Sequence, residues 1–307
     1  MGITSPTRAM PVLTDYLEAD LISESAQVAP GEAFWVGFHF KIRDGWHIYW
    51  RNPGEAGMPT SIEWDLPFGF VAGEIQWPNP KYFEVSKIIN FGYEREVVLM
   101  AQITPPALIA PGAYFEIKAN AEWLGCKDIC VPGDAQSSIK LQIAEHVLEY
   151  DASQKILFDD FRAQLPVRDS EIRAIAEVDG DFVNLNIAME KNTGTKATFF
   201  PWDPDLVELS GIHSKMKRNR IEWKLKQFNP GSKMHKNLRG YLVFDTAEGE
   251  DSVESFWIDT PITKMVPAKK YLGLTLKPWI AIISIMGYIF GALAVYAWKR
   301  NKYQKRS

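Results

Sequence analysis

Hydrophobic and polar positions alternate with a period of two in several segments of this chain. The alternation is clearest in three runs of apolar residues, which are Phe34, Val36, Phe38, Phe40 and Ile42; Val183, Leu185, Ile187 and Met189; and Ile221, Trp223 and Leu225. Strict alternation is typical of a β-strand with one buried face. Weaker candidate strands cover residues 17–23, 97–103, 114–121, 138–143, 241–245 and 255–258. The pattern therefore predicts a mainly β protein.

Turn signals separate these candidate strands. They include Pro30-Gly31, Asp44-Gly45, Asn52-Pro53-Gly54, Pro78-Asn79-Pro80 and Pro111-Gly112. Short strands between such signals are typical of antiparallel sandwiches. One segment has a helical period instead, since Leu157, Phe161 and Leu165 recur every four residues before Pro166. We expect two immunoglobulin-like antiparallel β-sandwich domains joined by this short helix, at residues 151–165.

Residues 278–298 contain no charged side chain and would span about 31 Å as a helix. That length matches the hydrocarbon core of a bilayer, and Trp279, Tyr296 and Trp298 lie where an aromatic belt would. We therefore predict a C-terminal transmembrane helix. No signal peptide is visible before Thr14. Lysines and arginines flank both ends of the predicted span, so they orient it only weakly.

These patterns together predict the domain organisation. Its segments are an N-terminal extension (1–15), a first β-sandwich (16–148), a helical connector (149–168), a second β-sandwich (169–264), a basic juxtamembrane linker (265–277), the transmembrane helix (278–298) and a basic tail (299–307). A net charge of −4 without a basic stripe in the soluble part argues against nucleic-acid binding. The chain has neither a GxSxG nucleophile motif nor a phosphate-binding glycine loop.

The candidate chemistry lies in the only two cysteines, Cys126 and Cys130. Residues four apart in an extended strand are about 13 Å apart, too far for a disulfide, whereas a helical turn or a tight loop brings them close enough. Pro132 and Gly133 favour a loop here. A small ring stabilises a fold little, and small or exposed disulfides tend to be labile. Reversible redox chemistry is the favoured interpretation, with a structural disulfide or a metal site as alternatives.

Two histidines near the first predicted strand, His39 and His47, could in principle complete a metal site with the cysteines. Neither has ligand spacing relative to them, so we expect ordinary surface or hydrogen-bonded histidines and no cofactor. Copper(I) bound by the two thiolates needs fewer ligands and stays an alternative function. A non-catalytic, membrane-tethered binding module is the third.

Several ordered motifs resemble one known family. They are Gly45-Trp46-His47-Ile48-Tyr49-Trp50-Arg51-Asn52-Pro53-Gly54, Trp64-Asp65-Leu66-Pro67, Trp77-Pro78-Asn79-Pro80, Phe91-Gly92-Tyr93-Glu94 and Trp123-Leu124-Gly125-Cys126 through Cys130-Val131-Pro132-Gly133. Over about 130 residues the chain resembles the N-terminal periplasmic domain of the DsbD and ScsB type of transmembrane thiol–disulfide interchange proteins. The second predicted sandwich, with Phe199-Phe200-Pro201, resembles the ScsB arrangement more loosely.

The resemblance implies an immunoglobulin-like sandwich whose redox pair, here Cys126 and Cys130, accepts electrons from a membrane-embedded domain. It implies a protein-disulfide reductase that passes these electrons to thioredoxin-like periplasmic oxidoreductases or isomerases. The soluble domains would then lie in the periplasm, anchored by one helix to a bacterial inner membrane. Family members carry a multi-helix membrane domain with its own cysteines, which this chain lacks. We therefore expect a separate membrane electron-transfer protein as a partner.

Family members also cover the cysteine pair with an aromatic cap loop. Residues 82–87 lie in about the corresponding place, which makes Tyr82, Phe83 and Glu84 the candidate cap residues. Aromatic side chains from the motifs could in addition shield the pair from adventitious oxidants. The candidates for such shielding are Trp46, Tyr49, Trp50 and Trp123.

Overall fold

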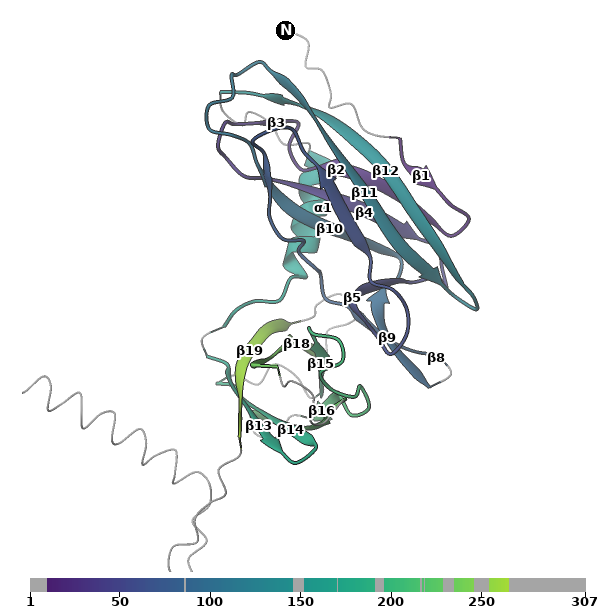
Figure 1. The fold of residues 1–307 in the computed structure, drawn as a ribbon, viewed down its shortest axis with the longest axis vertical. Coiled ribbons are helices and arrows are strands. Elements are labelled where there is room, and N and C mark those ends of the chain that lie inside the picture. Colours follow the sequence, from purple (N-terminus) through teal and green to yellow (C-terminus); the bar gives the residue numbers. More distant parts are fainter. Residues whose placement is uncertain are drawn as a thin grey trace, which may run out of the picture. The chain divides into compact units, whose positions relative to one another are not determined.

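The computed structural model describes residues 10–85, 87–145, 152–169, 171–190, 196–215, 217, 219–228, 235–245 and 254–264. Within these ranges the protein is mainly β with one helix, which confirms the predicted class (Figure 1). The predicted transmembrane helix at 278–298 lies outside the described residues, as do the linker, the basic tail and most of the N-terminal extension. No helix in the described part of the chain is long and apolar enough to span a bilayer.

Two sheets face each other in the N-terminal part. The first has the order β1-β2-β4-β10-β7, from β1 (Val12–Leu13), β2 (Leu17–Ser23), β4 (Phe34–Ile42), β10 (Glu96–Thr104) and β7 (Val71–Ala72). The second has the order β3-β12-β11-β6, from β3 (Gln27–Val28), β12 (Cys130–Ile143), β11 (Tyr114–Cys126) and β6 (Ser61–Asp65). Aromatic contacts join the two sheets, with Phe40 and Trp123 at 5.4 Å and Phe34 and Phe115 at 6.2 Å between ring centroids. This is the predicted sandwich.

Strand β4 departs from the expectation of one polar face. Both faces are largely buried, and His39 is only 5% exposed. Helix α1 (Ala152–Ala163) lies against this sheet at the Trp35 end of the outer face, and the His39 Nε2 lies 2.6 Å from the Glu96 carboxylate of the neighbouring strand β10. The Arg162 guanidinium of the helix lies over the Trp35 ring at 5.7 Å.

Helix α1 confirms the predicted helix, although its buried residues are Phe158 and Phe161 rather than a stripe from Leu157 to Leu165. The guanidinium of Arg162 also contacts the carboxylate of Glu24 at 2.6 Å, and Glu24 is 7% exposed. If the helix moved away, the buried Glu24 carboxylate would lose its charged partner, so this ion pair restricts the position of the helix.

A third, smaller sheet lies beside the cysteine end of the sandwich. It has the order β5-β9-β8, from β5 (Ile48–Gly54), β9 (Ile88–Tyr93) and β8 (Lys81–Val85). Asn52-Pro53-Gly54 lies at the irregular end of β5, where the Gly54 N–H donates to the Asn52 Oδ1 at 3.1 Å as in an Asx turn. Residues 82–85 of the expected cap loop belong to strand β8, which forms a hairpin with β9. Turn-forming residues are tolerated in β5 because its register with β9 shifts after Tyr49.

The C-terminal part is again antiparallel β. Its strands are β13 (Arg173–Asp179), β14 (Phe182–Ala188), β15 (Lys196–Pro201), β16 (His213–Lys215), β17 (Arg220–Lys226), β18 (Asn237–Asp245) and β19 (Ser255–Lys264). They connect as one seven-stranded sheet in the order β16-β15-β18-β19-β13-β14-β17. From here on 'the second sheet' means this sheet of the C-terminal part, as distinct from the two sheets of the N-terminal sandwich and from the small sheet β5-β9-β8. The sheet folds over a core of its own, since Phe199 of β15 packs against Trp223 of β17 at 6.2 Å. The predicted alternation holds in β14 and β17.

Candidate redox site

The two cysteines close the tip of a long β-hairpin. Strands β11 and β12 pair in continuous register up to Cys126 opposite Cys130, and the connection contains only three residues, Lys127, Asp128 and Ile129. The two Cα atoms are 4.1 Å apart and the sulfurs form a disulfide. The tight-loop geometry expected from the sequence is therefore confirmed.

The expectation that Pro132 and Gly133 lie in a loop was wrong, because both belong to strand β12 opposite Leu124 and Trp123. Gly133 lies where a side chain would not fit. A Cβ atom there would come within 2.6 Å of the Trp123 Nε1 and Tyr16 hydroxyl oxygen. The glycine thus gives the hairpin room to pack closely against two aromatic rings and does not mark a turn.

The two sulfur-bearing residues differ in exposure. Cys126 is 2% exposed, whereas Cys130 is exposed to solvent. Ile129 in the connecting loop is 68% exposed as well. A macromolecular partner can therefore reach Cys130 from outside, while Cys126 faces the interior.

The buried sulfur has a specific partner in Tyr49. The Tyr49 hydroxyl donates to the Cys126 Sγ at 3.2 Å and lies 3.9 Å from the Cys130 Sγ. Burial raises the pKa of the Tyr49 hydroxyl above its ordinary value, so the group keeps its proton at physiological pH. Tyr49 is thus a fixed hydrogen-bond donor aimed at one of the two sulfurs.

Two small residues hold Tyr49 in place. The Thr60 hydroxyl donates to the Tyr49 carbonyl oxygen at 2.9 Å. Gly57 lies flat on the phenol ring, where an added Cβ would be 2.3 Å from the ring carbon Cε1. The sequence offered no signal for either residue, because both contacts arise only when the loop after β5 folds back.

His47 lies directly beside the disulfide. Its backbone exchanges two hydrogen bonds with Cys126, at 3.0 and 2.9 Å. Its ring stacks on Phe83 with centroids 4.8 Å apart and meets the edge of Tyr49 at 5.3 Å. Burial lowers the pKa of the His47 imidazole, and the Glu94 carboxylate opposes this only in part. Its Nε2 has no hydrogen-bond partner among the described residues.

The three candidate cap residues separate in the structure. Phe83 reaches the site through its stack on His47. Tyr82 faces away from it and packs on His213 of β16 at 4.7 Å, and its hydroxyl donates to the Glu84 carboxylate at 3.0 Å. Adjacent residues of a strand point to opposite faces, which explains the separation.

Two of the candidate shielding tryptophans, Trp46 and Trp123, contact Tyr16, which is bonded to the hairpin. Trp46 stacks on Tyr16 at 4.6 Å, and Trp123 donates from Nε1 to the Tyr16 hydroxyl at 3.2 Å. The Tyr16 hydroxyl in turn donates to the Val131 carbonyl oxygen at 3.1 Å. Sequence reasoning missed Tyr16, which lies more than a hundred residues from the hairpin that it supports. Trp50, the remaining candidate, is fully buried on the face of β5 opposite Tyr49.

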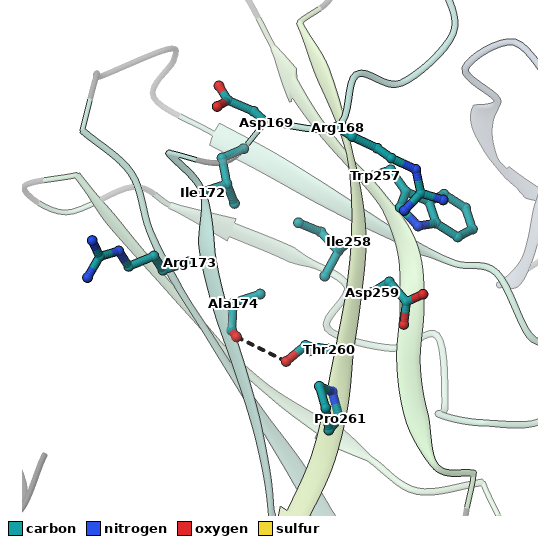
Figure 2. A pocket seen from close by; sticks show the side chains of 10 residues that line it. All are labelled: Arg168, Asp169, Ile172, Arg173, Ala174, Trp257, Ile258, Asp259, Thr260 and Pro261. Atoms are coloured by element: carbon teal, nitrogen blue, oxygen red, sulfur yellow. Dashed lines mark hydrogen bonds between the residues drawn. The ribbon is translucent and has the colours of Figure 1, made fainter. Parts of the chain in front are cut away.

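Among the described residues, neither a metal site nor the groove on the second sheet coincides with the disulfide. In the part of the chain that the structure describes, no group of three or more histidine, cysteine, aspartate or glutamate side chains is arranged to hold a metal ion. Figure 2 shows a groove of about 670 Å³ on the second sheet, between β13 and β19. Arg168 and Trp257 lie at one end of it, and Thr260 donates to the Ala174 carbonyl oxygen across it at 3.0 Å. It contains neither cysteine.

Comparison with solved structures gives a strong match to a periplasmic domain. The N-terminal periplasmic domain of ScsB from Proteus mirabilis is similar over 84% of this chain and 99% of its own, with a TM-score of 0.62 and 16% identity. Two further matches are too dissimilar to support an argument. The YadV chaperone has 10% identity and a TM-score of 0.21 over 78% of this chain and 98% of its own. Spo0M of Bacillus subtilis has 8% identity and a TM-score of 0.22 over 80% of this chain and 91% of its own. A search of curated protein sequences finds no match.

The structural likeness to the ScsB domain extends over both the sandwich and the second sheet, because it covers most of the chain. At this level of identity it establishes a shared fold. The sequence comparison is more specific and falls on the part with the disulfide, since it matches residues 18–142 to the N-terminal part of the thiol:disulfide interchange protein DsbD. Residues 18–142 are therefore a domain of the DsbD N-terminal family, built on the fold of the ScsB periplasmic domain.

Proposed function

We propose that this protein is a membrane-anchored thiol–disulfide exchange protein. It passes reducing equivalents from a membrane electron donor to thioredoxin-like periplasmic oxidoreductases or isomerases through Cys126 and Cys130. The observation that carries the proposal is the asymmetry of the disulfide. One cysteine, Cys130, is exposed at the tip of a hairpin, and the other, Cys126, is buried with its sulfur against a hydroxyl donor.

The asymmetry supports one order of events for loading the domain. A thiolate of the donor protein attacks the exposed Cys130 Sγ, and a new disulfide forms between donor and Cys130. The Cys126–Cys130 bond breaks, and its electron pair leaves on the Cys126 Sγ as a thiolate, to which the Tyr49 hydroxyl donates. A second donor thiolate then attacks the mixed disulfide and releases Cys130. The donor dithiol is oxidised to a disulfide, and the domain gains two electrons and two protons.

Delivery to the acceptor is the same chemistry in reverse. The Cys130 thiolate attacks the acceptor disulfide and forms a mixed disulfide. The Cys126 thiolate then attacks Cys130 and releases the reduced acceptor. In both directions Cys126 never needs to meet another protein, which is consistent with its burial.

The cellular setting is part of the proposal. The similar ScsB domain is periplasmic, and residues 18–142 match the N-terminal part of the thiol:disulfide interchange protein DsbD, which supports a periplasmic setting for this domain. We place the domains at 16–148 and 169–264 in the periplasm, with residues 278–298 as a single helix in the inner membrane. A membrane thiol donor outside the hairpin then supplies the electrons, since both cysteines of residues 1–307 are in the hairpin.

An equilibrium titration tests the redox assignment. The purified protein is incubated over a range of reduced to oxidised glutathione ratios, and free thiols are trapped by alkylation at each ratio. A reversible two-electron transition within the range of physiological potentials is expected. A pair that stays fully oxidised or fully reduced at every ratio contradicts the proposal. Tight stoichiometric copper(I) binding by the reduced protein, without such a transition, would favour the copper function instead.

A further inference from the structure

Two strands beside the disulfide carry adjacent aromatic residues that face in opposite directions. On β5, Tyr49 reaches the Cys126 sulfur, while its neighbour Trp50 is turned away and has no exposed surface. On β8, Phe83 faces the site and Tyr82 faces His213 of the second sheet. The small sheet β5-β9-β8 therefore contacts the redox site on one face and the second sheet on the other.

Trp50 contacts an aromatic cluster of the second sheet. Its ring lies edge-on to three rings there, those of Phe200 at 6.4 Å, Trp202 at 5.7 Å and Tyr241 at 5.1 Å. The Tyr241 hydroxyl also donates to the Trp77 carbonyl oxygen at 3.1 Å. Edge-to-face pairs add to the stabilisation that burial alone supplies, so this cluster is a firm attachment.

The two residues after Trp50 are bound to the same segment. The Arg51 guanidinium lies over the Trp202 ring, 3.6 Å from its centroid. The Asn52 amide donates to the Pro201 carbonyl oxygen at 2.7 Å, and Asn52 is 2% exposed. Three consecutive residues of β5 thus contact the end of β15 and the residue that follows it.

These contacts matter because the regular ladder stops at Tyr49. Tyr49 is opposite Gly92 of β9, but the next paired residue is Gly54, opposite Asn90. The segment between them bulges out of the ladder, so hydrogen bonds to β9 do not fix it. Its position is set by the second sheet, and Tyr49 is the last residue before that segment.

We propose that the second sheet is a positioning platform for the redox pair: through Trp50, Arg51 and Asn52 it holds Tyr49 with its hydroxyl on the Cys126 sulfur. Trp202 is the central positioning residue, since it contacts both Trp50 and Arg51. This inference rests on the proposed exchange function and assigns the second sheet a part in it. The platform makes no contact with either sulfur among the described residues, and its effect passes through Tyr49 rather than through the Tyr82–His213 contact of β8.

A double-mutant cycle tests this route. The variants are Trp202→Leu, Tyr49→Phe and the combination, in the full chain. The measurement is the rate at which a small dithiol reduces the disulfide. We expect Trp202→Leu to slow reduction about fivefold, and to have almost no further effect once the Tyr49 hydroxyl is absent. Trp202→Phe retains an aromatic ring and should restore most of the rate.

The matched control is Phe244→Leu. Phe244 is fully buried in the second sheet and packs on Phe256, so its truncation weakens that sheet without touching the cluster. It should lower the stability and leave the reduction rate unchanged. If Trp202→Leu fails to fold, Arg51→Met removes the contact with Trp202 from the other side and should also slow reduction.

Two results overturn the inference. One is equal slowing by Trp202→Leu with and without the Tyr49 hydroxyl, and the other is an unchanged rate in folded Trp202→Leu or Arg51→Met protein. Neither result contradicts the proposed exchange function, because that function is tested separately by the equilibrium of the wild-type disulfide with glutathione. Loss of that equilibration in the wild type is the separate result that removes the proposed function.

Discussion

The hydroxyl of Tyr49 donates a hydrogen bond to the sulfur of Cys126 at 3.2 Å, while the sulfur of Cys130 is 3.9 Å away from it. This relationship makes the two halves of a small disulfide chemically different. A hydroxyl that keeps its proton stabilises a thiolate more than it stabilises a disulfide sulfur. In the exchange that we propose, this hydrogen bond favours cleavage with Cys126 as the leaving group.

The Tyr49→Phe variant tests this relationship directly. Hydrogen bonds to charged groups contribute about 1.5–3 kcal/mol, so loss of the hydroxyl should slow reduction of the disulfide by about tenfold or more. Stopped-flow reduction by a small dithiol measures the rate. Tyr114→Phe is the matched control, since Tyr114 lies at the opposite end of β11 and is 65% exposed. Equal rates for wild type and Tyr49→Phe would remove Tyr49 from the mechanism.

The difference in exposure predicts which cysteine traps a partner. Cys126→Ser leaves the exposed Cys130 thiol, and it should accumulate mixed disulfides with thioredoxin-like proteins. Cys130→Ser leaves the buried Cys126 thiol and should trap far less. Non-reducing electrophoresis with and without a dithiol reductant measures the adducts. Greater trapping by Cys130→Ser contradicts the assigned order of attack.

Gly57 offers a structural test of how Tyr49 is held. Gly57 has φ +108°, and an added Cβ would collide with the Tyr49 ring at 2.3 Å. Gly57→Ala should therefore lower the free energy of unfolding by about 2–3 kcal/mol and slow reduction, combining backbone strain with overpacking.

The control for that substitution is Gly112→Ala. Gly112 also has a positive φ, +88°, but an added Cβ would meet nothing within 4 Å. Gly112→Ala should lower the free energy of unfolding by about 1 kcal/mol, from backbone strain alone, and should leave the reduction rate unchanged. Chemical denaturation measures both costs. Equal losses in the two variants would mean that Gly57 has no specific contact with Tyr49.

Two buried histidines predict how stability depends on pH. Burial is the largest cause that lowers the pKa values of His39 and His47 below their ordinary value of 6.5 in the folded protein. The unfolded chain therefore binds protons that the folded chain does not, and stability should fall as the pH drops below about 6.5. The stability that depends on neutral His39 and His47 should be fully present at pH values well above 6.5.

The variant His47→Phe checks this account. It retains an aromatic ring to stack on Phe83 and removes one titrating group, so it should flatten part of the decline between about pH 7 and pH 5. Denaturant midpoints at several pH values measure the slope. An unchanged slope in His47→Phe would mean that His47 does not contribute to it.

Much of the fold follows from local pattern. The alternation in residues 34–42, 183–189 and 221–225 predicted strands that the structure confirms as β4, β14 and β17, because a half-buried strand alternates apolar and polar side chains. The helix before Pro166 followed in the same way. The spacing of the two cysteines restricted them to a tight turn, since extended backbone separates them too far.

Local pattern failed where a distant segment decides the conformation. Pro132 and Gly133 are turn formers, yet they lie in β12, because the register with β11 and the close packing of Tyr16 and Trp123 favour a strand. The face of β4 that carries His39 was expected to be polar and exposed, yet His39 is buried and Arg162 of helix α1, far along the chain, lies over Trp35 on that face.

The sequence by itself determined the β class of the chain, the position of the cysteine pair and the likeness of residues 18–142 to the DsbD N-terminal family, because these depend on short-range periodicity and on motifs. Only the tertiary structure decided that Cys130 is the exposed cysteine and that the Tyr49 hydroxyl donates to the Cys126 sulfur. Exposure and hydrogen bonding at the site depend on segments that are distant in sequence and meet only after folding. A local pattern of hydrophobic and polar residues does not predict which distant segments will come into contact.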